Sequence, residues 1–208
     1  MTPDACRQHG HDRFSGVRAN IRADVGRYLT MSPENIERGS GFKQRLSAFL
    51  RPELLCLTMH RIAHYLHVRG WRRSARLVTR INALLHKVHL TPQSCIGPGC
   101  RLPHPSGLAF HGRAGSGLTL FSTCVCCPAG PIVDGPLEVA PCLGDDVTVG
   151  GHAVLIGPIK VGDRVKISFS ARVAEDVPSD VVVISRSVRN RVVPNGTGSE
   201  NVAIEGAV

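Results

Sequence analysis

The sequence predicts a mainly β protein, a parallel β-helix preceded by an α-helical segment, and three observations lead to that fold class. Beyond Thr91 apolar residues recur every six positions, and several of them are followed by glycine. The fifth position of the same hexads holds small or β-branched residues. Glycine and proline recur too often in this half of the chain for helix interiors. A period of six suits a prism of short strands, whose stacked rungs bury a continuous apolar column.

Length and composition agree with one globular domain. The chain has 208 residues, of which 42% are hydrophobic, and no run approaches the roughly 18 apolar residues that a membrane-spanning helix needs. The opening MTPDACRQHGHDRFSG has no basic stretch followed by an apolar one, so we expect no signal peptide and a cytoplasmic protein. In that compartment the eight cysteines are expected to be thiols rather than a disulfide framework.

The charge balance favours an anionic partner. The 25 Lys and Arg residues exceed the 16 Asp and Glu residues, giving a formal charge of +9. A nucleic acid, a phosphorylated cofactor or an acidic carrier protein would each suit that charge. The sequence has no recognition helix and no aromatic residues spaced for base stacking. We therefore rank nucleic-acid binding last. A nucleic-acid-binding protein would show an affinity for nucleic acid that falls steeply as the salt concentration rises.

The first half of the chain divides in two. Residues 1–45 have no sustained period and are taken as a variable N-terminal segment. Residues 46–90 are expected to form two amphipathic helices broken near Gly70. The apolar residues at helical spacing are Met59, Ile62, Ala63, Leu66, Leu77, Ile81, Leu84, Leu85 and Val88.

The hexads extend over residues 91–178 in two phases. Their first positions are Ile96, Leu102, Leu108, Ala114, Leu120 and Cys126, then Leu143, Val149, Leu155, Val161, Ile167 and Val173. Their fifth positions are Cys100, Ser106, Gly112, Leu118 and Cys124, then Val147, Ala153, Ile159, Val165, Ala171 and Val177. The step from Cys126 to Leu143 is not a multiple of six, so residues 127–142 are expected to leave the coil as a loop. Residues 179–208 are expected to form a C-terminal strand and a flexible tail.

Three stretches carry a resemblance to a known family: RIAHYLHVRGW, IGPGCRLPHPSGLAF, and the run from CLGDDVTVGG to VAEDVP. Together with the hexads they resemble the bacterial serine O-acetyltransferases and their shorter relatives, over about residues 59–178. The resemblance implies a left-handed β-helix, trimers or dimers of trimers, and acetyl-CoA bound in clefts between coils. The left hand comes from the resemblance alone, because parallel crossovers are normally right-handed.

The resemblance also implies catalytic and acceptor-binding residues. The motif from Leu102 to Gly107 matches the family's catalytic coil, which makes His104 the candidate general base; the alternative is a hydrogen-bonded corner histidine. His89 stands where the family has a carboxylate that orients this imidazole, and Pro103 stands where it has another. Ala140 replaces a family histidine that contacts acceptor. Asp24 and Glu53 are the two candidates for the family's helical carboxylate, and the sequence does not align either one with it.

For the cofactor, Gly150, Gly151 and Ala153 match the family's pantetheine-contacting coil, where small side chains let a thioester arm approach. His152 is a candidate for lining the same cleft, and Phe169 replaces a small residue in the next turn. Arginine suits phosphate, and the candidates are Arg172, Arg186, Arg189 and Arg191. The expected cofactor is acetyl-CoA, and no metal is expected.

Other histidines and cysteines are weaker candidates. His111, close behind the catalytic motif, is a candidate second acid-base or substrate-binding group. His60, His64 and His67 recur at helical spacing, but no Glu completes a metalloprotease pattern. The spacing of Cys124, Cys126, Cys127 and Cys142 is not that of zinc-binding pairs; Cys126 and Cys127 remain candidates for metal ligands or an acyl-accepting thiol.

These observations predict a CoA-dependent O-acyltransferase that moves acetyl to a hydroxyl of a small acceptor, with serine as the first guess by resemblance. A sugar or a carrier-protein-linked substrate stays open as the acceptor, because the family's acceptor-binding acids are missing. A rival of another class is a non-catalytic trimeric scaffold or partner subunit, since stacked coils are stable without an active site.

Overall fold

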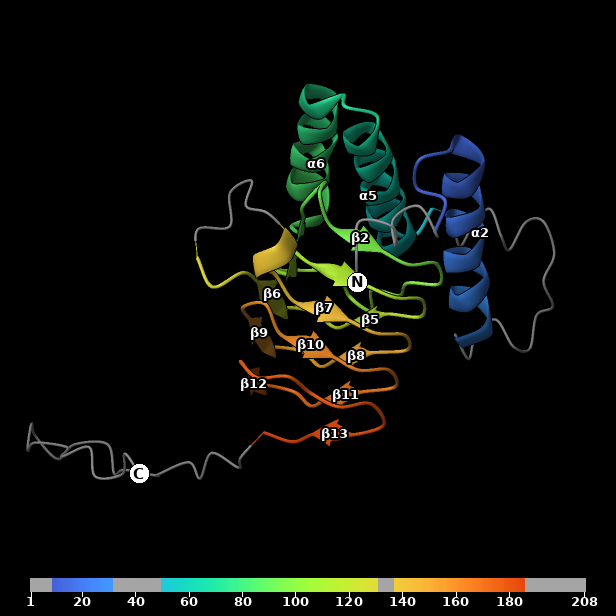
Figure 1. Cartoon of the computed structure of the whole chain (residues 1–208). Helices are drawn as coiled ribbons and strands as arrows, with labels where there is room; N and C mark the ends of the chain where they lie inside the picture. Colours follow the sequence, from blue (N-terminus) through green and yellow to red (C-terminus); the bar gives the residue numbers. More distant parts are fainter. Residues whose placement is uncertain (1–8, 32–49, 131–136, 186–208) are drawn as a thin grey trace, which may run out of the picture.

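The chain forms a β-helix of three parallel sheets, with two helices packed on one end and a third helix alongside (Figure 1). A computed structural model describes residues 9–31, 50–130 and 137–185. Among these residues, no helix combines the length and the apolar character that crossing a membrane requires.

Within residues 9–31 and 50–88, three helices precede the β-helix. Helix α5 (Pro52–Val68) and helix α6 (Arg72–His86) form the expected pair, with Pro52 in the first turn and Gly70 at a φ of 83° in the break between them. Helix α2 (Phe14–Met31) lies in the segment for which the sequence showed no period. Its buried side chains are those of Val17, Asn20 and Asp24, so its position depends largely on polar contacts that the pattern does not reveal.

Helix α6 buries a different face from the one its apolar residues suggest. Its buried side chains are those of Ala75, Thr79 and Asn82, and Asn82 donates a hydrogen bond to the carbonyl of Cys56 in α5. Its large apolar side chains are exposed: Leu77, Ile81, Leu84 and Leu85. Within one chain, α6 therefore presents an apolar face to its surroundings.

Short strands build the three sheets. Sheet 1 contains β1 (His89–Leu90), β3 (Ala109–Phe110), β6 (Val125–Cys127), β9 (Val154–Ile156) and β12 (Arg172–Val173). Sheet 2 contains β2 (Cys95–Ile96), β4 (Arg113–Ala114), β7 (Cys142–Leu143) and β10 (Lys160–Val161). Sheet 3 contains β5 (Thr119–Leu120), β8 (Thr148–Val149), β11 (Lys166–Ile167) and β13 (Val182–Val183).

The strand register confirms the hexads. Ile96 pairs with Ala114 and Leu143 with Val161, so the members of each pair are three hexads apart. Ala114 pairs with Leu143, which lies more than three hexads ahead, because the excursion between β6 and β7 lengthens this turn. The described end of this excursion contains a 3-10 turn, η1 (Leu137–Val139), and residues 131–136 lie outside the described chain.

One hexad assignment was wrong. The first position in sheet 1 belongs to Phe110, which pairs with Leu90 and Cys126, and not to Leu108. Leu108 instead takes the buried fifth position, and Ser106 is exposed. An insertion in the turn that carries His104 causes this shift. The next turn is shorter by the same number of residues, so counting in sixes from Ile96 still reaches Ala114. The count therefore does not reveal that Phe110 replaces Leu108 at the first position.

The column inside the prism is apolar from end to end. Side chains such as Leu120, Leu143, Leu155 and Ile167 are at most 2% exposed. Each such burial is worth roughly 1.5–3 kcal/mol, so the stacked rungs stabilise one another. Glycine follows several of these residues because the rungs touch there: a Cβ on Gly144 would lie 2.8 Å from the backbone carbon of Gly162 in the next rung.

A buried ion pair fastens the helices to the first rung. Arg61 of α5 and Asp24 of α2 are 1% and 2% exposed and make two contacts of 3.1 Å. Arg61 also donates to the carbonyls of Ile96 and Gly97, and Asp24 accepts from the backbone N–H of Cys100 at 2.8 Å. The pair thus joins two helices and the first turn of the β-helix.

Candidate functional site

The turns between sheets stack into columns along the prism, and one column collects most of the predicted site residues. We call it the His104 corner: the turns that join sheet 3 to sheet 1. It comprises Pro103–Gly107, Ser122–Thr123, Gly151–His152 and Phe169–Ser170. Backbone hydrogen bonds connect successive turns, from Thr123 N to Ser106 O at 3.0 Å and from Ser170 N to Gly151 O at 2.9 Å.

His104 lies at the apex of the longest of these turns. Its φ is 51°, a left-handed conformation that few non-glycine residues adopt, and its side chain is exposed. The carbonyl of His104 accepts from Ser106 N at 2.8 Å, and Gly107 N donates to Lys87 O at 2.9 Å. These bonds hold the backbone, while the described chain gives the imidazole no hydrogen-bond partner. Its ring is therefore directed by the turn and not by another side chain.

His89 begins β1 beside this turn. Its backbone N–H donates to Leu108 O at 2.8 Å, and its side chain is exposed on the outer face. In the described chain no hydrogen bond joins His89 to His104. Pro103, half-buried, precedes His104 and cannot donate from its backbone. No carboxylate among the described residues forms a hydrogen bond to His104, so the imidazole lacks the orienting acid that the family resemblance implies.

The cofactor candidates share the His104 corner, two and three turns further along. His152 is exposed with a φ of 58°, and Ala153 behind it is fully buried. Phe169 is 63% exposed, and its ring lies 5.6 Å from the ring of Phe121. The four residues Gly151, His152, Ala153 and Phe169 thus follow one another along the edge below His104.

The two glycines of this edge are required by close approach. A Cβ on Gly150 would lie 2.7 Å from the backbone nitrogen of Phe169, and one on Gly151 would lie 3.2 Å from the ring of Phe169 and from Ser122 O. A side chain at either position would displace the neighbouring turn. Both glycines are buried, and their lack of side chains lets successive turns of this edge stack closely beside the exposed His152.

Two other predicted residues lie on a different edge. His111 and Ala140 are in turns that join sheet 1 to sheet 2, and both side chains are buried. His111 contacts Thr91 Oγ1 at 3.0 Å, and Thr91 Oγ1 in turn lies 2.6 Å from Ser94 Oγ. This hydrogen-bonded setting makes His111 part of the packed corner. Within one chain the structure does not bring His111 or Ala140 to His104.

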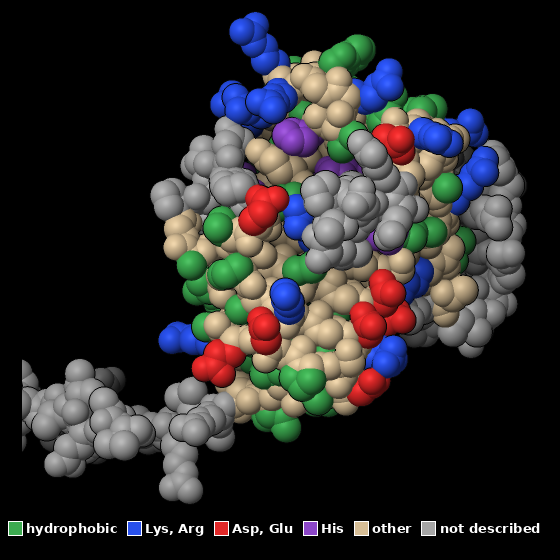
Figure 2. Space-filling model, in the orientation of Figure 1, with side chains coloured by type: hydrophobic (Ala, Val, Ile, Leu, Met, Phe, Trp, Pro, Cys, Tyr) green, Lys and Arg blue, Asp and Glu red, His purple; other side chains and the backbone are tan. Residues whose placement is uncertain are grey.

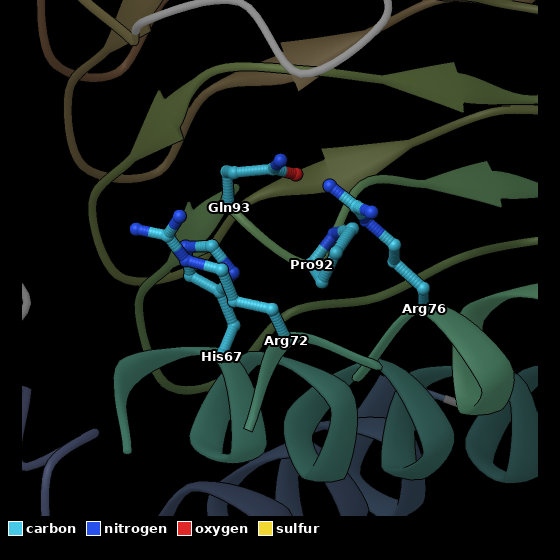
Figure 3. Close-up of a pocket in the computed structure, with 5 residues that line it drawn as sticks. All are labelled: His67, Arg72, Arg76, Pro92 and Gln93. Carbon is cyan, nitrogen blue, oxygen red and sulfur yellow. The ribbon is translucent and has the colours of Figure 1, made fainter. Parts of the chain in front are cut away.

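A pocket of about 230 Å³ opens beside that second edge, between the helices and the first rung (Figure 3). His67, Arg72, Arg76, Pro92 and Gln93 line it. Two guanidinium groups in one pocket suit a carboxylate or phosphate. Figure 2 shows that Lys and Arg side chains gather over the helical end of the molecule, while most Asp and Glu side chains lie among the rungs.

The cysteines do not form a site at the loop. None of the seven described cysteines is in a disulfide, which confirms the expectation for these residues. Burial raises the pKa of Cys124 to about 12 and that of Cys126 well above its ordinary value, so neither thiol is a nucleophile near neutral pH. Burial also raises the pKa of Cys127.

The remaining candidates divide by position. Asp24 is not available to an acceptor, because its carboxylate is buried against Arg61. Glu53 lies in the first turn of α5, and one of its carboxylate oxygens is buried. Arg172 is exposed on β12, the strand that follows the turn of Phe169. Arg186, Arg189 and Arg191 lie outside the described residues.

A group of buried histidines was not foreseen as a group. His11, His60 and His64 are each at most 2% exposed, at the junction of the N-terminal turn, α5 and the first rung. Burial, with the neighbouring His64 and Arg61, lowers the pKa of His11 to about 2, and burial lowers that of His60 well below its usual value. His11 stood in a segment without a pattern, so nothing in the sequence signalled that it would meet His64.

Known proteins resemble the chain in both sequence and fold. No family model matches it. Serine acetyltransferase of Mycobacterium tuberculosis is 31% identical over 138 residues, which are 65% of this chain and 59% of that protein. Serine acetyltransferase of Synechococcus elongatus is 28% identical over 137 residues, 64% and 54% of the two chains. The chain thus spans a little over half the length of these relatives.

Solved structures agree. Serine acetyltransferase isoform 3 of Entamoeba histolytica, in complex with cysteine, has a TM-score of 0.74 at 18% identity, covering 92% of this chain and 64% of that one. Serine acetyltransferase of Neisseria gonorrhoeae, in complex with serine, has a TM-score of 0.72 at 21% identity, covering 86% and 70%. The resemblance to the serine acetyltransferases is confirmed. The likeness in fold also confirms the left-handed β-helix, whose hand the hexads could not supply.

Proposed function

We propose that this protein is a CoA-dependent O-acetyltransferase that acts on the hydroxyl of serine or of a similarly small acceptor. The observation that carries the proposal is the shared edge: His104 is exposed at the apex of a left-handed turn, in the same column of hydrogen-bonded turns as the exposed His152 and Phe169. The similarity to serine acetyltransferases supports acetyl-CoA as donor and serine as first acceptor.

The proposed chemistry is direct transfer. The imidazole of His104 takes the proton of the acceptor hydroxyl as the oxygen attacks the thioester carbonyl carbon. The tetrahedral intermediate collapses when the carbon–sulfur bond breaks. The imidazolium then returns its proton to the departing CoA thiolate. Backbone N–H groups at the coil edge are the proposed donors to the oxyanion.

The thioester arm is proposed to lie along the glycine edge. Gly150 and Gly151 let the turns of this edge stack closely, and Phe169 forms the far wall of the proposed path with Phe121. His152 flanks the same path. Arg172, exposed just beyond Phe169, is the described cation best placed for a CoA phosphate, and Arg189 remains a proposed partner outside the described chain.

Acceptor binding is proposed to need a neighbouring chain. His111 and Ala140 lie on a different edge of the prism from His104, so a single chain does not gather all the predicted acceptor residues. A homotrimer, alone or paired, would place edges of different chains together. The exposed apolar face of α6 supports assembly, because such faces are usually covered.

The test is thiol release from acetyl-CoA with L-serine, other hydroxy amino acids and sugars as acceptors. We expect acceptor-dependent release with serine, and a fall in kcat of about 10²–10⁴-fold in His104→Ala. His152→Ala, at the same kind of left-handed position on the same edge, is expected to raise KM for acetyl-CoA more than it lowers kcat. Glu175→Gln, exposed on the last rung, is the control and should match the natural chain.

Other outcomes are equally informative. Release with a sugar but not with serine would keep the mechanism and correct the acceptor. If calorimetric titration detects no CoA binding and no acceptor releases thiol, the acetyltransferase proposal fails, and the chain becomes a scaffold or partner subunit.

A further inference from the structure

Three side chains that can bind metal meet in the core where the helices join the β-helix. His11 comes from the turn before α2, His64 from α5, and Cys95 from β2. Each is at most 2% exposed, and one ligand atom from each lies within 4.8 Å of the other two. The three residues lie far apart in the sequence, so only the fold brings them together.

The two imidazoles present nitrogens without partners. Nδ1 of His64 donates to the carbonyl of Pro92 at 2.9 Å, which leaves the lone pair on Nε2, and Nε2 is buried without a hydrogen bond. Neither ring nitrogen of His11 makes a hydrogen bond of standard geometry, although the backbone of Ile96 lies close. Buried polar atoms normally have partners, so these orphaned nitrogens need an explanation.

The hydrogen bond of His64 is the kind that accompanies metal ligation. A ligating histidine usually donates its other ring N–H to a carbonyl or carboxylate, which fixes the tautomer and the direction of the ring. The ring of His11 stands edge-on to that of His64, with centroids 4.7 Å apart and an angle of 89° between planes. An edge-on pair is an ordinary aromatic packing arrangement; a shared ion would in addition account for the nitrogens that lack partners.

We propose that His11, His64 and Cys95 bind a zinc ion that fastens the N-terminal turn and α5 to the first rung of the β-helix. Two imidazole nitrogens and one thiolate form a ligand set that zinc favours. Zinc–nitrogen bonds of about 2.0–2.1 Å and a zinc–sulfur bond of about 2.3 Å in a tetrahedron place ligand atoms roughly 3.3–3.6 Å apart. Closing from the observed limit of 4.8 Å therefore takes side-chain movements of about an ångström.

The surroundings suit a structural ion. His9, whose ring centroid lies 5.9 Å from that of His11, is the proposed source of a fourth ligand. The guanidinium of Arg61 faces this region and Cys95, but its charge is balanced by Asp24. The site is closed to solvent and lies at the turn of Pro92, away from the His104 corner. A role in holding the helices, and not in acyl transfer, follows from that position.

His60 is not part of this set. The helical spacing of His60 and His64 is the pair that the sequence offers, yet their rings are stacked with centroids 6.2 Å apart. His60 therefore packs behind the site. The ligands come instead from three separate segments, which is why a local motif search does not find them.

The test is the metal content of the full chain. The protein is purified without chelator, dialysed first against a buffer that contains zinc, and then dialysed against a metal-free buffer. We expect one zinc per chain by mass spectrometry, and after exchange with cobalt a thiolate-to-cobalt charge-transfer band. Cys95→Ser and His11→Gln should each abolish zinc binding. A chelator should lower the Tm of the natural chain but leave the Tm of these two variants unchanged. The matched control is Cys126→Ser, which alters an equally buried thiol in β6 and should still bind zinc and still respond to the chelator.

The natural chain tests the proposal independently if a variant does not fold. Zinc well below one equivalent per chain after dialysis, or a cobalt complex without a thiolate band, would overturn the proposal. A folded Cys95→Ser chain that retains stoichiometric zinc would overturn it as well. His11→Gln alters a turn before α2, outside the β-helix, and is the variant expected to fold most readily.

Discussion

Removing the charge of Asp24 tests how the helices are held on the β-helix. The carboxylate is 2% exposed, contacts Arg61 at 3.1 Å through both oxygens, and accepts from Cys100 N at 2.8 Å. In Asp24→Asn the side chain keeps its size, but the buried guanidinium loses its counter-charge. We therefore expect this substitution to destabilise the fold far more than its small change in shape suggests.

The magnitude follows from the class of interaction. Leaving one member of a buried ion pair without its partner costs about 3–5 kcal/mol. In a domain of this size each kcal/mol lowers Tm by about 2–4 °C, so Asp24→Asn is expected to lower Tm by about 6–20 °C. The assay is thermal and urea unfolding at one fixed protein concentration, because assembly would make Tm depend on concentration.

The control is an exposed ion pair of similar geometry. Arg164 and Asp180 lie 2.6 Å apart with side chains 59% and 61% exposed, so Asp180→Asn should leave Tm unchanged within error. A second variant separates charge from anchoring. Replacing the pair with apolar residues, Asp24→Leu with Arg61→Met, would orphan the carbonyls of Ile96 and Gly97, and so should recover only part of the loss. An Asp24→Asn chain within about 1 kcal/mol of the natural one would refute the reasoning.

Two further predictions concern the β-helix itself. Gly144→Ala should lower the free energy of unfolding by about 1–3 kcal/mol, because its Cβ would press on Gly162 in the next rung. Gly26→Ala in α2, which has open space around it, should be neutral or stabilising. Urea unfolding of both variants checks this prediction, and equal effects of the two substitutions would contradict it. Stability should also fall above pH 9, since burial raises the pKa of Cys100 and Cys124 to about 12 while the unfolded thiols ionise near their ordinary value of 9.0. Each of these thiols then lowers the free energy of unfolding by about 1.4 kcal/mol per pH unit between pH 9 and 12. If the stability of a Cys124→Ala chain falls as steeply with pH as that of the natural chain, the Cys124 thiol is not responsible.

The sequence by itself determined the rungs. A hexad with an apolar first residue can repeat only if every third hexad returns to the same face, so Ile96 had to share a sheet with Ala114, and Leu143 with Val161. The excursion between Cys126 and Leu143 followed from the same arithmetic, as did the helix break at Gly70 from the helical pattern around it. The motif around His104 marked the candidate base before its position was known. These features are local or periodic, and local information is what a sequence displays.

The tertiary structure alone decided how the site and the junction are assembled. The turn of His104 is lengthened and the next turn is shortened by the same amount, so the count conceals a change that moves Phe110 into the column. His111 and His104 are close in sequence, yet they occupy different edges because one strand of sheet 1 separates their turns. Asp24, His11 and Cys95 find their partners in distant segments of the chain, and no periodic pattern encodes such pairings. Polar contacts between segments far apart in the chain depend on how the helices pack on the first rung, and only the folded chain fixes that packing.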